Sequence, residues 1–255
     1  APTEIYTLSL HDALPISVVL THKPWNPESL LWLGCTFMLA LSPGAVVAGL
    51  FADGSVAQMA ANITVLPVAI LVSIIVWFQV NHRVYRSPIW LADTFGFNRK
   101  NTGRCLMLGL VTGLGLVLIS MVLALLTSQL IHALGDQAEP QKLVTLIAEE
   151  YSKKENIRTL IFFVVMAVVV APIAEEILFR GILYPAIKQI GYPRLAAIGT
   201  ALLFALFHVN LLTFASLTVV ALGLIALYEF TDNLLAPITA HAVFNASNLI
   251  MLFWR

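Results

Sequence analysis

Three short groups of ionisable and polar residues interrupt the apolar C-terminal half of the chain. They read APIAEEILFR at 171–180, FALFH at 204–208 and HAVFN at 241–245. Placing Asp, Arg or Lys at the centre of a membrane helix costs about 2.5–3.5 kcal/mol, so such residues usually face a protein interior or a water-filled cavity. Two carboxylates, two histidines and an asparagine supply a general base, a partner for it and donors for an oxyanion. These are the groups that hydrolysis of an amide by water requires.

In the first group, the two adjacent acids are expected to have different partners. Glu176 and Arg180 are four residues apart, so they share a helix face and can pair. Glu175 lies about 100° away around the helix and is free to face a cavity. The alternative is a purely structural ion pair next to a helix-end acid.

Taken singly, the other two groups have simpler explanations. A lone histidine such as His208 is more often packed or interfacial than catalytic. His241 and Asn245 share a face, and hydrogen bonding between membrane helices would explain both. Taken together, the three groups lie on three different apolar segments, as convergence on one cavity requires. The combination therefore favours a hydrolytic site.

The ordered set EExxxR, FxxxH and HxxxN resembles the CPBP family. That family includes Rce1-type prenyl-protein CAAX endopeptidases and bacterial bacteriocin-processing and immunity (ABI) relatives. The resemblance covers roughly residues 160–252, and the helices before it carry no diagnostic residues. All three motifs are intact, as Glu175-Glu176 with Arg180, Phe204 with His208, and His241 with Asn245.

The resemblance implies a role for each motif residue. Glu175 would be the general base that activates water, and His208 would help to hold that water. His241 and Asn245 would stabilise the oxyanion on the scissile carbonyl. The supporting residues, which would shape the site, are Glu176, Arg180 and Phe204.

Metal dependence is the open alternative for this residue set. One carboxylate and two histidines resemble a zinc or iron ligand set, here Glu175, His208 and His241. The sequence contains no HExxH motif. The mechanism that the resemblance implies is metal-independent glutamic hydrolysis, so we expect no cofactor.

The elements that must position these residues are membrane helices. The 255 residues are 59% hydrophobic and 11% charged, against about 25% charged in a soluble domain, and the mean hydropathy is +0.89. A bilayer core of about 30 Å needs about 20 apolar residues per helix. We therefore predict an all-α, polytopic bundle of about seven helices, with an eighth as the alternative for the complete protein. The expected helices are at 29–51, 60–80, 105–134, 158–188, 194–209, 212–228 and 234–254.

Charge in the loops predicts the orientation of the bundle. The loop at 82–104 contains five Arg and Lys residues against one acid, so the positive-inside rule places it in the cytoplasm. The apolar residues of 140–152 follow helical spacing, which suggests a helix that lies in the membrane interface. We expect a multi-pass protein, in a prokaryotic cell membrane.

The beginning of the chain is expected to have a different origin from the remainder, the alternative being a genuine polar N-terminal tail. Residues 6–16, YTLSLHDALPI, match the translation of a sequencing adapter. We interpret 1–17 as a non-native, adapter-derived segment and exclude it from the fold. Residues 18–255 are then a single integral membrane domain, with the catalytic core at about 158–255. A genomic locus that encodes the first residues would contradict this interpretation.

The leading function is an intramembrane endopeptidase that acts on a peptide or membrane-protein substrate, which in a CAAX processor is prenylated. The alternatives are a non-catalytic bacteriocin-immunity or scaffold protein and, less favoured, a proton-coupled transporter. A scaffold does not need an intact set of four polar residues, namely Glu175, His208, His241 and Asn245. No inverted repeat in the sequence supports a transporter. The lipid bilayer is an expected partner. A net charge of zero argues against nucleic acid.

Overall fold

The computed structural model describes residues 20–23, 25, 27–52, 55–84, 94–97, 101–137, 142–153 and 157–254, in which all regular structure is helical. The predicted all-α fold class is confirmed. The elements are α1 (Pro27–Gly49), α2 (Val56–Arg83), α4 (Thr102–Ala133), α5 (Lys142–Lys153), α6 (Ile157–Val165), η2 (Met166–Val170), α7 (Ala171–Glu176), η3 (Ile177–Leu183), α8 (Tyr184–Gln189), α9 (Pro193–Phe207), α10 (Leu211–Thr231) and α11 (Leu235–Phe253).

Six helical spans within these residues are long and apolar enough to cross a membrane. One of them is continuous from Ile157 to Gln189 and joins α6, η2, α7, η3 and α8. The predicted apolar helices are therefore found where they were expected. The exception in length is α9, which has 15 residues. At 1.5 Å per residue it is about 22 Å long, shorter than a bilayer core.

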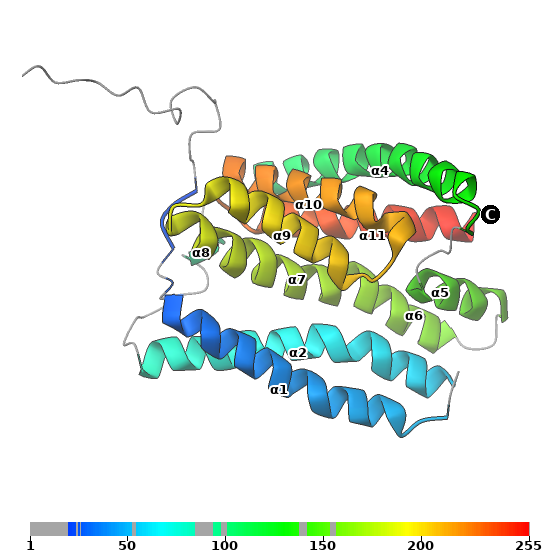
Figure 1. The fold of residues 1–255 in the computed structure, drawn as a ribbon, viewed down its shortest axis with the longest axis horizontal. Helices are drawn as coiled ribbons and strands as arrows, with labels where there is room; N and C mark the ends of the chain where they lie inside the picture. The colour runs from blue at the N-terminus through cyan, green and yellow to red at the C-terminus, as the bar shows by residue number, and fades with distance from the viewer. Residues whose placement is uncertain are drawn as a thin grey trace, which may run out of the picture.

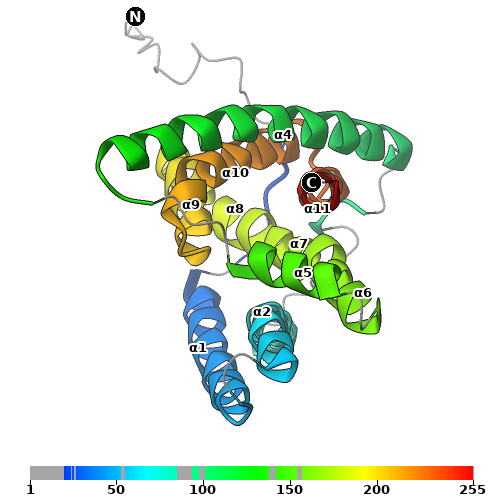
Figure 2. The ribbon, with the colours of Figure 1, turned by 90° about the vertical axis from the view of Figure 1, so that its right-hand side faces the viewer.

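The helices form three layers (Figures 1 and 2). The antiparallel pair α1 and α2 forms one outer layer, and α2 contacts α7. The segment from α6 to α8 runs through the middle, with α9 beside α8. The other outer layer contains α4, α10 and α11, with α4 packed along both α10 and α11. The central layer therefore presents α7 to α11, and these two helices carry most of the candidate site.

The helix expected at 140–152 is present as α5. Its Ile147 is fully buried in a small cluster with Phe163 and Leu249. The ring of Tyr151 stacks on Phe253 with centroids 4.5 Å apart. This packing anchors α5 against α6 and the end of α11 (Figure 1). Its placement in the membrane interface stays a prediction.

At the opposite end of the bundle, buried polar contacts join distant parts of the chain. Lys23 Nζ lies 3.0 Å from Asp232 Oδ1, and the two side chains are buried, with 1% and 0% of their surface exposed. The amide of Asn233 donates to the carbonyl of Gly96 at 2.8 Å. The segment before α1 is therefore integrated with the turn between α10 and α11. The predicted non-native segment 1–17 lies outside the described residues, as does most of the basic loop.

Candidate active site

The helix that carries the two acids is irregular on both sides of them. The π-helical segments η2 and η3 flank α7, and each is followed within two residues by a proline, Pro172 or Pro185. A proline inside a helix has no N–H to donate, and its ring clashes with the carbonyl four residues earlier. A wider π turn before the proline relieves that clash, and such turns often occur at functional sites.

Glu176 is the structural acid of the pair. Its Oε1 atom accepts a hydrogen bond from Arg180 Nη1 at 2.8 Å and lies 2.8 Å from His241 Nδ1. The side chains of Glu176 and Arg180 are 0% and 1% exposed. A second guanidinium nitrogen of Arg180 donates to the carbonyl of Ala221 in α10. The pair predicted from the four-residue spacing is present, and it also joins α7 to α10 and α11.

Glu175 points away from that pair, as the spacing indicated. Its side chain is 12% exposed, and its Oε2 atom lies 3.9 Å from His241 Nε2. This distance is too long for a direct hydrogen bond. Among the described residues, Oε2 of Glu175 has no hydrogen-bond partner. The imidazole of His241 thus lies between two carboxylates, bonded to one and facing the other.

The ring of Phe204 packs against the side chains of His208, His241 and Arg180. Its ring centroid lies 4.9 Å from that of His208 and 5.7 Å from that of His241. The guanidinium carbon of Arg180 lies 4.6 Å from the same centroid, in a cation–π contact. The Phe204 side chain therefore packs against residues from all three motifs, while Phe204 itself is 1% exposed.

His208 is brought near the site without a bond to the acids. It caps the end of α9, and its Nδ1 atom lies 2.9 Å from the carbonyl oxygen of Phe204. In the described part of the chain, no hydrogen bond or ion pair joins it to Glu175. The residue after it, Val209, has a φ of 44°, which does not continue a right-handed helix. The α9 helix therefore ends at Phe207, two residues before the expected end at 209.

Asn245 has a partner that the motifs did not suggest. Its Nδ2 atom donates to the backbone carbonyl of Ala167 in η2 at 2.8 Å. This contact spans 78 residues, and no pattern in the sequence marked Ala167 as a functional position. The one available signal was Pro172, since a proline within an apolar run indicates an interrupted hydrogen-bond ladder.

The residues of the zinc alternative do not form a metal-ligand group. Across the described ranges, no three His, Cys, Asp or Glu side chains lie together as a metal ion would require. His208 in particular contacts a backbone carbonyl and an aromatic ring. The expectation of a metal-independent site stays a prediction.

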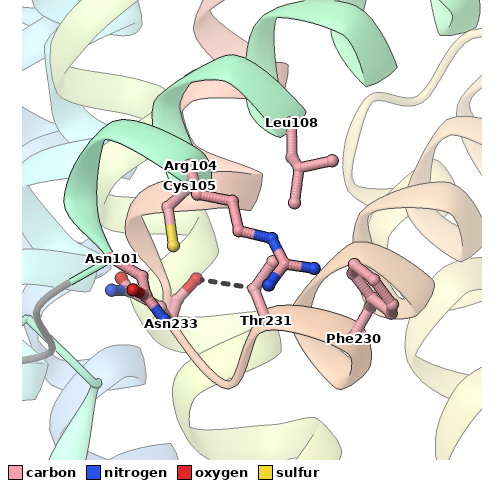
Figure 3. Close-up of a pocket in the computed structure, with 7 residues that line it drawn as sticks. All are labelled: Asn101, Arg104, Cys105, Leu108, Phe230, Thr231 and Asn233. Atoms are coloured by element: carbon pink, nitrogen blue, oxygen red, sulfur yellow. Dashed lines mark hydrogen bonds between the residues drawn. The ribbon is translucent and has the colours of Figure 1, made fainter.

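A separate pocket lies at the end of the bundle where α4 begins (Figure 3). Its volume is about 210 Å³, and it contains neither motif acids nor histidines. The exposed guanidinium of Arg104 lies 5.5 Å from the centroid of the Phe230 ring in this pocket. The lining residues are Asn101, Arg104, Cys105, Leu108, Phe230, Thr231 and Asn233.

The fold and the site define a polytopic helical membrane protein with a buried Glu–Glu–Arg–His cluster. Residues 157–247 match the family model described as Type II CAAX prenyl endopeptidase Rce1-like. The chain thus carries an Rce1-like domain of the CPBP family at these residues, and this match supports an endopeptidase at the level of the family. No curated protein and no solved structure matches the chain.

Proposed function

We propose that this protein is an intramembrane endopeptidase in which Glu175 activates the attacking water. The observation that carries the proposal is the unequal environment of the two acids. Oε1 of Glu176 is bonded to Arg180 and His241, and the Glu176 side chain is 0% exposed. The Glu175 side chain is 12% exposed, and no described residue forms a hydrogen bond with its Oε2 atom. The Oε2 atom of Glu176 also lacks a partner, but it belongs to a fully buried ion pair. A general base needs a lone pair that no other group occupies.

The bond to Glu176 orients the ring of His241. With Nδ1 held 2.8 Å from Glu176 Oε1, the Nε2 atom is directed toward Glu175 at 3.9 Å. In the proposed reaction this Nε2 atom is the donor to the developing oxyanion.

The remaining two polar residues complete the proposed machinery. His208 uses Nδ1 on the carbonyl of Phe204, so its Nε2 atom is the one left to hold the water. Asn245 uses one amide hydrogen on Ala167, and the second remains for the oxyanion. Glu175 Oε2 and His241 Nε2 are 3.9 Å apart, so in the proposed reaction both can contact the same atom of a water or substrate.

The substrate is a peptide bond in or near the bilayer. Glu175 lies near the middle of the span Ile157–Gln189, so the substrate must reach the site from within or beside the membrane. A membrane protein or membrane-bound peptide meets this requirement. A prenylated C-terminal segment is the form that the family description suggests.

The test is cleavage of membrane-embedded and prenylated peptides by the purified protein in liposomes. Wild type should cleave at least one of them, and Glu175→Gln should not. The matched control is Glu149→Gln, because Glu149 is an exposed acid on α5. Equal cleavage by Glu175→Gln would remove Glu175 as the base. If neither wild type nor control cleaves any peptide, a non-catalytic immunity or scaffold role is favoured.

We further propose that the segment between α2 and α4 is cytoplasmic, in a prokaryotic cell membrane. With the helix ends beside it, over residues 82–104, it contains Arg83, Arg86, Arg99, Lys100 and Arg104 against the single acid Asp93. Such an excess of positive charge is retained on the cytoplasmic side. In a chain without Cys35 and Cys105, a cysteine at position 83 should be shielded from an impermeant thiol reagent in intact cells. A cysteine at position 149 should react, and the reverse pattern would invert the topology.

A further inference from the structure

The pocket at the start of α4 takes no part in the proposed hydrolysis, and a cation lines it. Arg104 contributes this charge, and the other residues that line the pocket are uncharged. The nearest acids in the sequence to Phe230, Glu229 and Asp232, are buried and pair with lysines elsewhere. The described lining of the pocket is therefore electropositive. Its volume of about 210 Å³ can hold a phosphate group and the glycerol attached to it.

The donors of Arg104 are not used within the described part of the chain. No described residue accepts a hydrogen bond from its guanidinium or forms an ion pair with it. Its contact with the Phe230 ring is a cation–π interaction, which occupies none of the five N–H groups. The side chain of Asn101 makes no capping bond to α4 and lines the same pocket (Figure 3). Two sets of N–H donors are thus available to one anion.

The depth of Arg104 in the membrane suggests what that anion is. From Cys105 to Ile131 the chain contains no Asp, Glu, Lys or Arg, and such a run can cross a bilayer core. A charge placed inside the core is costly, so Arg104 lies at the level of the lipid headgroups. Leu108 lines the pocket and Phe230 is 57% exposed, so apolar surface adjoins the guanidinium. A ligand with a phosphate and an acyl chain matches both kinds of surface.

We propose that this pocket binds the phosphate of an anionic phospholipid, with Arg104 and Asn101 as its donors. Basic pockets between membrane helices are a recurring form of headgroup site. A guanidinium suits this ligand because its planar N–H groups match two phosphate oxygens at once. The pocket is formed by the start of α4 and by the turn that leads into α11, so the lipid would join these two elements. A ligand that binds only the folded state stabilises that state.

The experiment adds lipids to the protein purified in a neutral detergent, and it needs no cleavage assay. Bound lipid is counted by native mass spectrometry, and the melting temperature is measured at each concentration. The ligands are phosphatidylglycerol, zwitterionic phosphatidylcholine and inorganic phosphate, so that a headgroup site is distinguished from a site for a free anion. The proteins are wild type, Arg104→Gln, Asn101→Ala and the control Arg83→Gln. Arg83 is an exposed cation in the last turn of α2 and does not line the pocket.

Wild type should bind one phosphatidylglycerol with saturation and gain about 5 °C or more at about 100 times the dissociation constant. Phosphatidylcholine and inorganic phosphate should give no such gain at the same concentration. Arg104→Gln should bind phosphatidylglycerol about 10–100-fold more weakly, because charge-assisted hydrogen bonds are lost. Asn101→Ala should bind about fivefold more weakly.

The control Arg83→Gln should stay within about fivefold of wild type, which is the effect of removing one charge near an anionic surface. Without lipid, all four proteins should melt within about 2 °C of one another, because Arg104 is exposed and Asn101 makes no capping bond. A lipid-dependent shift that disappears in Arg104→Gln is then a loss of binding and not a loss of folding.

Three results would overturn the proposal. Equal weakening by Arg104→Gln and Arg83→Gln would mean that the lipid follows net charge and does not occupy this pocket. Equal binding of phosphatidylcholine would mean that the anionic charge is not recognised. A shift with inorganic phosphate as large as that with phosphatidylglycerol would assign the pocket to a free anion. None of these results depends on whether the protein cleaves a peptide, so the proposed endopeptidase and the lipid site stand or fall separately.

Discussion

His241 bonds to Glu176, with its Nδ1 atom 2.8 Å from Glu176 Oε1. A charged carboxylate only accepts hydrogen bonds, so Nδ1 carries the hydrogen and Nε2 is directed toward Glu175 at 3.9 Å. One acid therefore fixes the ring, and the other faces the remaining ring nitrogen. The two acids have different tasks, and replacing each by its amide should cause a different failure.

Glu175→Gln should abolish cleavage and leave the fold intact. Removing a general base typically costs about 10²–10⁴ in rate. The Glu175 Oε2 atom has no hydrogen-bond partner in the described part of the chain, so its loss should not lower the melting temperature. Both kcat/KM and thermal unfolding in detergent should be measured. A variant within tenfold of wild-type activity would contradict the assignment.

Glu176→Gln should instead destabilise the protein. The buried guanidinium of Arg180 would lose its carboxylate, and breaking a buried ion pair typically costs about 3–5 kcal/mol. The melting temperature should fall clearly, and activity should fall with it because His241 loses its anchor. The exposed Glu149→Gln is the control. An unchanged melting temperature for Glu176→Gln would show that the pair is not structural.

The sequence predicted part of this site for a clear physical reason. Glu176 and Arg180 are close in the chain, and an apolar helix offers a buried charge few other partners. The bond between His241 and Glu176 spans 65 residues and depends on how α11 packs, which no local pattern determines. For the same reason the sequence placed His241 and Asn245 in one motif and did not show that they bond to different residues, Glu176 and Ala167.

The π turns were not predicted either. The sequence predicts one continuous helix at 158–188, although this segment contains two prolines. Whether a proline bends, breaks or widens a helix depends on the donors that neighbouring helices offer to the freed carbonyls. At Ala167 the donor comes from Asn245, and at Gly181 the indole nitrogen of Trp25 donates at 3.1 Å. Both donors are remote in sequence.

Treatment with a strong chelator should leave activity unchanged. The zinc alternative needs Glu175, His208 and His241 together, and the described residues do not group them as metal ligands. Cleavage should be measured before and after chelation, and again after zinc is restored. Activity that disappears with the chelator and returns with zinc would establish a metalloprotease and would change the role of Glu175 from base to ligand.

Gly113→Val should displace the helix that carries His241. A Cβ atom at Gly113 would lie 2.6 Å from the carbonyl of Ala240 and 2.9 Å from the Cβ of Val243. Small residues allow membrane helices to approach closely, and α4 depends on this contact with α11. Overpacking typically costs about 1–3 kcal/mol, and an error of about 1 Å in the position of His241 can cost about 10² in rate.

The matched control for this prediction is Gly115→Val. Nothing lies within 4 Å of a Cβ atom built at Gly115, so the same substitution two residues away meets open space. Melting temperature and kcat should fall for Gly113→Val and stay near wild type for Gly115→Val. Equal effects at both positions would mean that the valine acts through the helix propensity of α4, and that close contact between α4 and α11 does not set the position of His241.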